Sequence, residues 1–353
     1  MPAPSGVKDE ILGFVAEWYD PRPQLVKTFL LKYYSATHDA ELIDIKAHRC
    51  FLKRSKLPSS VFPSDFNVGN PVLVYGRELK IVDYADPQTR KKLSPVSEST
   101  VVFCLPETTP SFGSIVQSCE SAGLRVSDLK TIAVSGGTTL SNASVLLGVS
   151  PDALSDSNGV SMVVAFKGQD SVQVAQRVLA KYGPGVICAN SEGAARDFTE
   201  SFLDAPSETT ATFDNCTCCL IKPHAVKAGS TGSIIDTILS QGYEVSAMQS
   251  FILDRAVAGE FFEVYKGVVE NHGAHVDELT TGKVIAIEVR AEDAVTTFRK
   301  TCGPYDVEMA KELAPKTIRG QHGVDNIRNA VHCTDLPTEG VNECDYFFNV
   351  LNL

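Results

Sequence analysis

The chain has 353 residues, 43% of them hydrophobic, and a mean hydropathy of −0.01, which is typical of a soluble protein with two or three globular domains. No stretch approaches the roughly twenty apolar residues of a membrane helix, and residues 1–8 lack the apolar segment of a signal peptide, so we expect a cytoplasmic protein without membrane partners. The formal net charge of −11 argues against nucleic-acid binding.

Positive charge is concentrated in the N-terminal region. Residues 1–95 carry 14 Lys and Arg against 11 Asp and Glu, a local charge of +3 that leaves −14 for the rest. Such a surface would suit an acidic polymer such as tubulin, although ordinary solvation explains the same charges. The region also contains short β-type segments between turn residues, at 14–19, 24–34, 41–45 and 71–75. We therefore predict a small β-rich domain over residues 1–92.

Several motifs in this β-rich region are distinctive as a set. They lie at residues 18–20, 33–34, 51–54, 69–72, 76–77 and 81–86. Together they resemble the DM-ten domain of proteins associated with ciliary and flagellar doublet microtubules. The resemblance implies a β-sandwich of the pleckstrin-homology type, a location in the cytoskeleton of the ciliary axoneme, and tubulin and other axonemal proteins as partners. Taken singly, Trp18, Tyr33 and Tyr34 are better explained as core residues.

An internal repeat follows residues 91–99, which are polar and predicted to be a linker. Residues 112–123, 161–166 and 171–184 match residues 231–242, 284–289 and 294–304 in spacing. In each copy, apolar residues at helical intervals lead to a terminating glycine, and the segments follow the order strand, helix, strand, helix. We therefore predict two ferredoxin-like α/β domains, over residues 98–207 and 212–353.

The C-terminal copy contains a histidine surrounded by residues suited to phosphate chemistry. His332 follows a stretch with Gly, Arg and Asn at residues 320–331, and Glu343 lies further on. A neutral imidazole, with an ordinary pKa of about 6.5, can attack phosphorus when a carboxylate such as Glu343 holds its second ring nitrogen. Arg299, Arg319 and Arg328 are available to bind phosphate oxygens.

A second motif lies upstream, where a predicted buried strand in residues 218–225 ends at Lys222. With residues 317–320 and 329–332, it resembles the nucleoside diphosphate kinase family over residues 215–347. The resemblance implies that His332 is the phosphorylated histidine and Glu343 the carboxylate that orients it. The other implied roles are phosphate binding by Lys222, Arg299 and Arg319, and a sugar contact by Asn329.

The reaction implied by this resemblance is ping-pong transfer. The γ-phosphate of ATP or another nucleoside triphosphate moves to His332 and then to a nucleoside diphosphate. Mg²⁺ would be carried mainly by the nucleotide phosphates, so no acidic metal cage is expected. Two nucleotide-binding positions depart from the family pattern. Phe262 stands where a Tyr is usual and loses a hydroxyl near the phosphates, and Tyr305 places a bulky ring where a Thr is usual.

The first copy lacks the groups that this reaction needs. The repeat places Leu105 at the position of Lys222 and Leu179 at that of Arg299, and no histidine occurs between residues 48 and 224. Without a nucleophile or phosphate-binding cations, it resembles a pseudo-kinase retained for its shape.

The ten cysteines have a structural explanation. A chain without an export signal is expected to keep its thiols reduced. In an extended strand Cys216 and Cys218 share one face and Cys219 points to the other. Because no second Cys or His pair stands at matching spacing, we predict packing rather than zinc binding. Cys333 is likewise predicted to be a neighbour of His332 rather than a nucleophile.

Two helices are predicted in the second copy, at residues 231–240 and 256–269. Tyr265 is a predicted core residue of the latter, with base stacking as the alternative. His272 and His275 are expected in a loop. His224 and His322 flank Lys222 and Arg319 and are expected to be solvent-exposed, with a place in the cleft as the alternative.

Two functions remain open from the sequence. In the first, the C-terminal domain alone is a nucleoside diphosphate kinase, and the protein is associated with doublet microtubules. In the second, it is a catalytically vestigial microtubule inner protein of the axoneme. Single-copy relatives assemble into hexamers, whereas two fused copies offer pairing within the chain.

Overall fold

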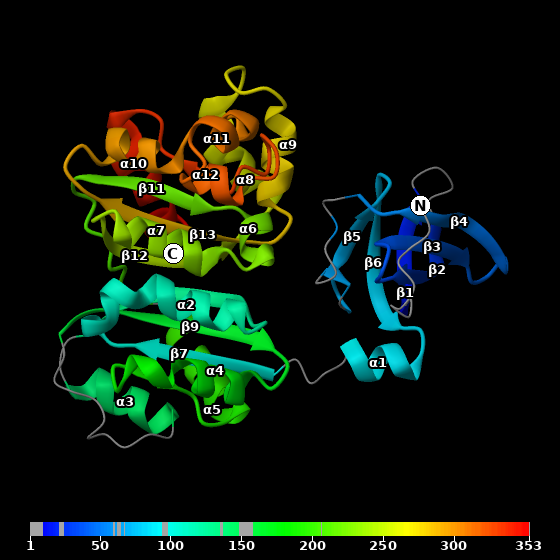
Figure 1. The fold of residues 1–353 in the computed structure, drawn as a ribbon, viewed down its shortest axis with the longest axis horizontal. Helices are drawn as coiled ribbons and strands as arrows, with labels where there is room; N and C mark the ends of the chain where they lie inside the picture. Colours follow the sequence, from blue (N-terminus) through cyan, green and yellow to red (C-terminus); the bar gives the residue numbers. More distant parts are fainter. Residues whose placement is uncertain are drawn as a thin grey trace. The chain divides into compact units, whose positions relative to one another are not determined.

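The structure is a computed structural model that describes residues 10–20, 25–58, 61, 65–66, 68–93, 98–134, 137–147, 158–205 and 207–352. The chain separates into two compact units, Met1–Val96 and Ser97–Leu353, which are described in turn (Figure 1). Among the described residues, no helix is both long and apolar enough to span a membrane.

The N-terminal unit is built on one six-stranded sheet, with neighbouring strands in the order β4-β3-β2-β1-β6-β5. Its elements are β1 (Ile11–Asp20), β2 (Leu25–Tyr34), β3 (Asp39–Asp44), β4 (Arg49–Lys56), β5 (Pro71–Val74), β6 (Arg77–Tyr84) and the helix α1 (Pro87–Leu93). All its strand pairs are antiparallel, and alternate residues of β2, namely Phe29, Leu31 and Tyr33, are buried. The prediction of a β-rich N-terminal region is confirmed.

Aromatic side chains form the core of this unit. The ring of Phe66 stacks on Phe14, with centroids 5.4 Å apart, and on Tyr33, at 4.6 Å. Trp18 is partly buried against the same core, and Tyr34 is buried. The structural explanation of the aromatic motif residues is therefore confirmed.

The predicted linker over residues 91–99 is wrong at both ends. The helix α1 continues to Leu93, and the next strand begins at Glu98; residues 94–97 lie outside the described residues. Asp86 caps α1 by accepting a hydrogen bond from the Thr89 N–H at 2.7 Å, and the Thr89 hydroxyl accepts one from the Gly13 N–H of β1 at 2.8 Å. The capping residue and its partner were the signal for this helix.

The second unit contains one eight-stranded antiparallel sheet in the order β10-β7-β9-β8-β12-β13-β11-β14. Its first half comprises β7 (Glu98–Cys104), α2 (Phe112–Ser121), β8 (Arg125–Val134), α3 (Gly137–Leu147), β9 (Gly159–Gly168), α4 (Ser171–Leu179), β10 (Val186–Cys188) and α5 (Glu192–Phe198). The second half comprises β11 (Cys216–Ile221), α6 (Pro223–Ala228), α7 (Thr231–Ser240), β12 (Glu244–Ile252), α8 (Arg255–Phe262), α9 (His272–Leu279), β13 (Lys283–Arg290), α10 (Ala294–Cys302), α11 (Val307–Leu313), α12 (Ile318–His322), β14 (Val331–Cys333) and α13 (Gly340–Asp345).

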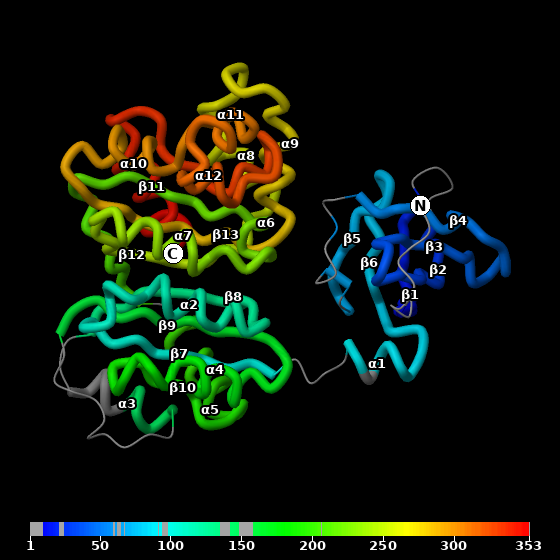
Figure 2. The backbone as a smooth tube through the Cα atoms, in the orientation of Figure 1, coloured from blue at the N-terminus to red at the C-terminus, as the bar shows by residue number. Residues whose placement is uncertain are grey.

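The two halves have the same strand arrangement. In each half, the strands are numbered here from one to four along the chain. From the outer edge of the sheet to its centre, both halves have the order four, one, three, two. The halves therefore meet at their second strands, β8 and β12. Figure 2 traces the backbone through the first half before it enters the second, so the halves follow one another in sequence. The boundaries 98–207 and 212–353 lie within one compact unit and stay predictions.

The two halves pair closely within the chain. Gln249 of β12 pairs with Lys130 of β8, and α2 packs against α7 beside this junction (Figure 1). A Cβ added at Gly232 would lie under 3.0 Å from the backbone nitrogen of Gln117, so the two helices approach to a distance that only glycine permits. Glu120 of α2 accepts hydrogen bonds from the first N–H groups of α7, at 2.8 Å from Gly232 and 3.3 Å from Thr231.

Both faces of the sheet are covered in the second half. On one face, Cys219 and Ile221 of β11 pack with the apolar side of α7 and α10. On the other, Cys216, Cys218 and Leu220 pack with α8, α9 and α13. The strand β11 therefore alternates between two buried layers, as predicted for its cysteines. The predicted helix at residues 231–240 is confirmed as α7.

Candidate active site

His332 lies on β14, a short edge strand that pairs with β11 opposite Leu220. Its neighbours Val331 and Cys333 pack into one core layer, so the imidazole projects to the opposite side of the strand, where the ring of Tyr265 lies 5.5 Å away, edge-on. The residue is 6% exposed. A three-residue strand thus fixes the direction of the candidate nucleophile.

Glu343 of α13 holds this imidazole in place. Its Oε2 lies 2.8 Å from Nε2 of His332 and accepts a hydrogen bond from the Thr334 hydroxyl at 2.9 Å. Its Oε1 accepts from the Tyr265 hydroxyl at 3.1 Å. Burial opposes ionisation of Glu343, but His332 and these hydrogen bonds together hold the pKa of the carboxyl below its usual value. With Nε2 engaged, Nδ1 is the nitrogen available to attack an electrophile.

A pocket of about 500 Å³ opens beside His332. Seven of the eight residues predicted for the site line it, namely Lys222, Phe262, Arg299, Tyr305, Arg319, Asn329 and His332. The eighth, Glu343, lies behind His332. Residues separated by more than a hundred positions in the sequence thus surround one cavity, and the roles assigned to them from the family resemblance stay predictions.

Two buried cations line the inner part of the pocket. Nζ of Lys222 donates a hydrogen bond to the carbonyl of Ile327 at 2.7 Å, and burial together with the charge of Arg319 lowers its pKa to about 7. Arg319 donates to the carbonyls of Gly303 at 2.9 Å and Val331 at 3.2 Å. An anionic ligand would favour the charged form of Lys222 at neutral pH.

Arg299 occupies the rim of the pocket. Its guanidinium donates to the Asp335 carbonyl at 2.8 Å and lies 3.1 Å from the Asp335 carboxylate. The side chain is half exposed, so this ion pair is weak, and a phosphate can compete with it. Among the described residues that line the pocket, Asp335 has the one carboxylate. The pocket therefore fits a nucleotide that brings its own Mg²⁺ better than it fits a metal ion held by several protein carboxylates.

Two buried polar atoms in the site lack a hydrogen-bond partner among the described residues. They are Oδ1 of Asn329, whose residue is 1% exposed, and Nε of Arg319. Unpaired polar atoms in a buried site cost free energy unless a ligand or water satisfies them. A hydroxyl group near Asn329 and an anionic oxygen near Arg319 would each do so, which matches the chemistry of a nucleotide.

Phe262 and Tyr305, the two residues that differ from the family pattern, both contact His275. The Phe262 ring is nearly parallel to that of His275, with centroids 5.6 Å apart. The Tyr305 hydroxyl lies 2.6 Å from Nε2 of His275. Burial and the charge of Lys222 lower the pKa of His275 to about 4, so the ring is neutral and can accept this hydrogen bond. Tyr305 is thereby held at the pocket rim.

The expectation that His272 and His275 lie in a loop is wrong. They belong to α9, and His275 is 2% exposed. This helix is difficult to predict from residue propensities, because Gly273 disfavours a helix and the preceding Asn271 has a left-handed conformation (φ 55°). The predicted helix 256–269 is also too long, because α8 ends at Phe262.

The expected exposure of His224 is wrong. The residue lies in α6 and is 4% exposed. Its Nδ1 lies 2.8 Å from Oε1 of Glu278, and its Nε2 accepts a hydrogen bond from the Ala330 N–H at 3.2 Å. His322 is half-buried and contacts the Ser233 hydroxyl at 3.2 Å rather than the pocket.

Two contacts of Glu343, with the hydroxyl groups of Tyr265 and Thr334, were not predicted from the sequence. The prediction that Tyr265 is a core residue is confirmed, and its hydroxyl also contacts Glu343. No local pattern indicates this, because the helix ends before Tyr265 and a short 3₁₀ turn redirects the side chain. For Thr334 a signal existed, since residues two apart in extended backbone share a face, as Thr334 and His332 do.

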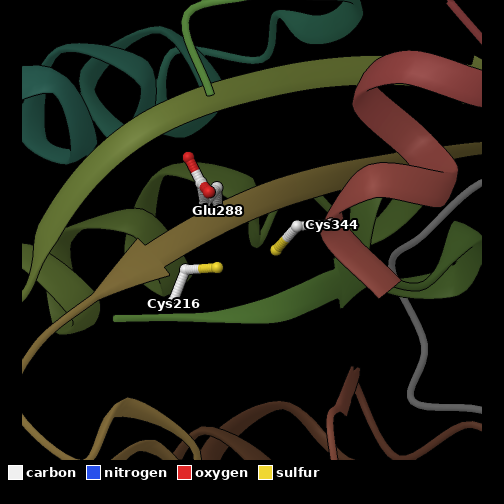
Figure 3. A group of neighbouring side chains, drawn as sticks. All are labelled: Cys216, Glu288 and Cys344. Atoms are coloured by element: carbon white, nitrogen blue, oxygen red, sulfur yellow. The ribbon is translucent and has the colours of Figure 1, made fainter. Parts of the chain in front are cut away.

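Three buried ligand-type side chains lie together between β11, β13 and α13 (Figure 3). The thiols of Cys216 and Cys344 point toward each other, and candidate ligand atoms of Cys216, Cys344 and Glu288 lie within 4.8 Å of one another. Both Glu288 oxygens are engaged, since they accept from the N–H groups of Thr212 and Phe213 at 2.7 Å, and one also accepts from the Ser246 hydroxyl. Tetrahedral zinc needs four ligands, and this carboxylate anchors backbone instead.

Comparisons with known proteins agree with this geometry. The family model described as nucleoside diphosphate kinase matches residues 215–353. The chain is 33% identical to nucleoside diphosphate kinase homolog 7 of Rattus norvegicus and also to that of Mus musculus, over 98% of this chain and 94% of each relative. A nucleoside diphosphate kinase of Aquifex aeolicus is 32% identical over 38% of this chain and 94% of that protein. The chain therefore belongs to the nucleoside diphosphate kinase homolog 7 family.

Proposed function

We propose that the C-terminal half transfers the γ-phosphate of ATP or another nucleoside triphosphate to a nucleoside diphosphate through phospho-His332. The observation that carries this proposal is the His332–Glu343 pair, at 2.8 Å, facing a pocket lined by Lys222, Arg299 and Arg319. A nucleophile with its orienting carboxylate and nearby cations is the arrangement that phosphoryl transfer requires.

The nucleophile of the first half-reaction is Nδ1 of His332. Its lone pair forms a bond to the γ-phosphorus while the bond from that phosphorus to the β–γ bridging oxygen breaks, and the diphosphate leaves. In the second half-reaction, a terminal oxygen of the incoming diphosphate attacks phosphorus, and the N–P electron pair returns to Nδ1. Glu343 accepts the Nε2–H hydrogen bond throughout and stabilises the positive charge on the phosphorylated ring.

The cations would bind the oxygens on which charge accumulates. Lys222 and Arg319 lie buried beside His332, and Arg299 approaches from the rim. Mg²⁺ carried by the nucleotide would neutralise further charge between the phosphates. Asn329, with its unpaired Oδ1, would accept a hydrogen bond from a sugar hydroxyl. Phe262 supplies no hydroxyl, so we expect slower transfer than in relatives with a Tyr at this position.

The first half is proposed to be a degenerate kinase-like domain that serves as a scaffold. It supplies the surface on which α7 packs, through Gly232 and Glu120. At the position that corresponds to Lys222 it has Leu105, which is buried. The predicted match of Leu179 to Arg299 is wrong, because α4 and α10 both have nine residues and counting from their first residues places Gln176 at the position of Arg299. Neither Leu105 nor Gln176 is a cation, which supports a structural role.

An axonemal location on doublet microtubules is the second part of the proposal, with a pleckstrin-homology-like fold for the N-terminal domain. The supporting observation is β4, an edge strand that carries Arg49, Lys53, Arg54 and Lys56 and no acidic residue. An edge strand rich in Lys and Arg suits an acidic polypeptide. The alternative to the first part of the proposal is a catalytically vestigial site in a microtubule inner protein of the axoneme.

Cosedimentation with microtubules tests the second part. We expect the full chain to pellet with them at low salt and a variant with Arg49→Glu and Lys53→Glu to stay in the supernatant. Equal pelleting of both proteins would contradict the role of β4.

Steady-state transfer tests the first part. The full chain is supplied with ATP and a second nucleoside diphosphate, and formation of the new triphosphate is followed. We expect transfer by the wild type and by His48→Asn, a substitution at an exposed histidine of the N-terminal unit, and none by His332→Ala. Transfer by His332→Ala would contradict the proposal.

A further inference from the structure

A strained turn precedes β14, the strand that carries His332. Ala330 has φ of +71°, a left-handed conformation that is uncommon for residues other than glycine, and it is fully buried. The Val331 N–H donates back to the Asn329 carbonyl at 2.9 Å, which closes a three-residue γ-turn around Ala330. His332 follows two residues later, so the turn sets the position from which the imidazole leaves the backbone.

Both peptide groups that flank Ala330 are held by one segment. The Ala330 carbonyl accepts a hydrogen bond from the Lys222 N–H at 2.9 Å. The Ala330 N–H donates to Nε2 of His224 at 3.2 Å. Strained backbone persists only where the surroundings fix it, and here the end of β11 and the start of α6 provide the partners.

The hydrogen bonds of His224 determine its tautomer. Because the Ala330 N–H is a donor, Nε2 must present its lone pair, and the ring proton therefore resides on Nδ1. Nδ1 lies 2.8 Å from Oε1 of Glu278, an acceptor that also receives the His224 backbone N–H at 3.2 Å. Both residues are buried, His224 at 4% and Glu278 at 8% exposed. Glu278 of α9 thus selects the one tautomer that can bind the turn.

We propose that His224 is a positioning residue, which holds the strained turn at Ala330 through the tautomer selected by Glu278 and thereby aims His332 into the pocket. His224 is not among the described residues that line the pocket, so we expect it to make no contact with a bound nucleotide. Its loss should therefore lower the rate of phosphoryl transfer without changing the KM for ATP. This catalytic consequence rests on the proposed function, whereas the effect on the turn does not.

A selective labelling experiment reads the turn directly. The sequence contains two Asn–Ala pairs, at 142–143 and 329–330, so the full chain labelled with [¹³C′]asparagine and [¹⁵N]alanine gives two identifiable amide signals. Ala143 lies in α3 of the first half and is the internal control for global opening. In His224→Leu we expect the Ala330 amide to exchange with solvent about tenfold faster or more, with Ala143 unchanged.

A conservative variant separates positioning from simple packing. In His224→Gln the side-chain carbonyl can accept the Ala330 N–H and the amide can donate to Glu278, so slow exchange should return. Unchanged exchange at Ala330 in His224→Leu would overturn the proposal. So would equal loss of protection in the Leu and Gln variants.

If His224→Leu does not fold, a second substitution tests the proposal. Glycine adopts positive φ without strain, so Ala330→Gly should restore folding to the Leu variant if His224 serves to hold the turn. If the double variant also fails to fold, His224 is needed for packing and the proposal is wrong.

A kinetic experiment distinguishes this inference from the proposed function. We expect the first-order rate of His332 phosphorylation to fall about tenfold in His224→Leu, with KM for ATP unchanged, and to recover in His224→Gln. If the wild type is never phosphorylated, the proposed function fails, and the amide exchange still decides the role of His224.

Discussion

Replacing Glu343 by Gln removes a charge and little else. Gln keeps one oxygen, which can accept from Nε2 of His332 and from the Thr334 hydroxyl, as Oε2 does now at 2.8 and 2.9 Å. The new amide would face the Tyr265 hydroxyl, which can rotate to accept instead of donating. The fold should therefore be retained, and the imidazole should stay oriented by a neutral partner.

The expected effect on rate follows from that geometry. A hydrogen bond to a charged group contributes about 1.5–3 kcal/mol, against about 1 kcal/mol for a neutral one. The positive charge on the ring develops only in the transition state and intermediate, so the difference between these two values, a loss of roughly 0.5–2 kcal/mol, lowers kcat by about 2- to 30-fold. Glu343 does not line the pocket, so KM for ATP should stay within about twofold.

The assay is rapid-quench phosphorylation of the protein by labelled ATP at varied concentration. Glu312→Gln, on an exposed surface, is the matched control and should behave as wild type. A wild-type rate in Glu343→Gln would refute the role of the carboxylate. A rise in KM with unchanged kcat would refute it equally, because it would place Glu343 in nucleotide binding.

Three further predictions concern Tyr265 and the junction of the two halves. Tyr265→Phe removes the donor to Oε1 of Glu343, so we expect a fall in kcat of about three- to tenfold by the same quench assay, and an unchanged rate would argue against a role for the hydroxyl. Gly232→Ala forces a methyl group against the Gln117 backbone and should lower the free energy of unfolding by about 1–3 kcal/mol in urea, whereas Gly259→Ala, with open space around it, should not. Burial raises the pKa of Glu120 to about 7 from an ordinary 4.5, so its folded form binds more protons, and its stabilising contribution is lost as pH rises through about 7. Denaturation of wild type and Glu120→Gln at pH 5 and pH 8 should thus favour the variant increasingly at the higher pH, and a constant difference would contradict the shifted pKa.

The sequence was sufficient to predict seven residues that line the pocket and the pairing of His332 with Glu343, but not the other contacts of Glu343. Lys222 at the end of a buried strand and His332 near Glu343 are local patterns, and each has a chemical reason that can be stated without a structure. The Tyr265–Glu343 contact depends on where α8 ends, and helix ends are set by tertiary packing more than by propensity. It was therefore out of reach of any periodicity argument.

His224 was misassigned for a related reason. A histidine after Lys222 and Pro223 suggests a polar turn, since proline commonly starts a helix or ends a strand. Its burial results from α9, whose Glu278 comes from more than fifty positions further on and supplies the acceptor. A buried polar residue is tolerated only with partners, and partners distant in sequence are invisible in one chain without structure.

The repeat was recognisable because helices α2 and α7 carry the same spacing of apolar residues and glycines. Their mutual packing was foreseen only as one of two options. Gly113 and Gly232 look like ordinary helix residues in the sequence, and their close contacts with the opposite helix are seen only when both are in place.

The measurement that tests the central claim most directly is isolation of the phosphorylated protein and its discharge. The full chain is incubated with [γ-³²P]ATP and Mg²⁺, freed of nucleotide, and then mixed with an unlabelled nucleoside diphosphate. We predict an acid-labile, base-stable label on the wild type that is absent from His332→Ala and passes to the diphosphate to give a labelled triphosphate. A wild type that binds ATP and stays unlabelled, or a label that His332→Ala retains, would contradict the account.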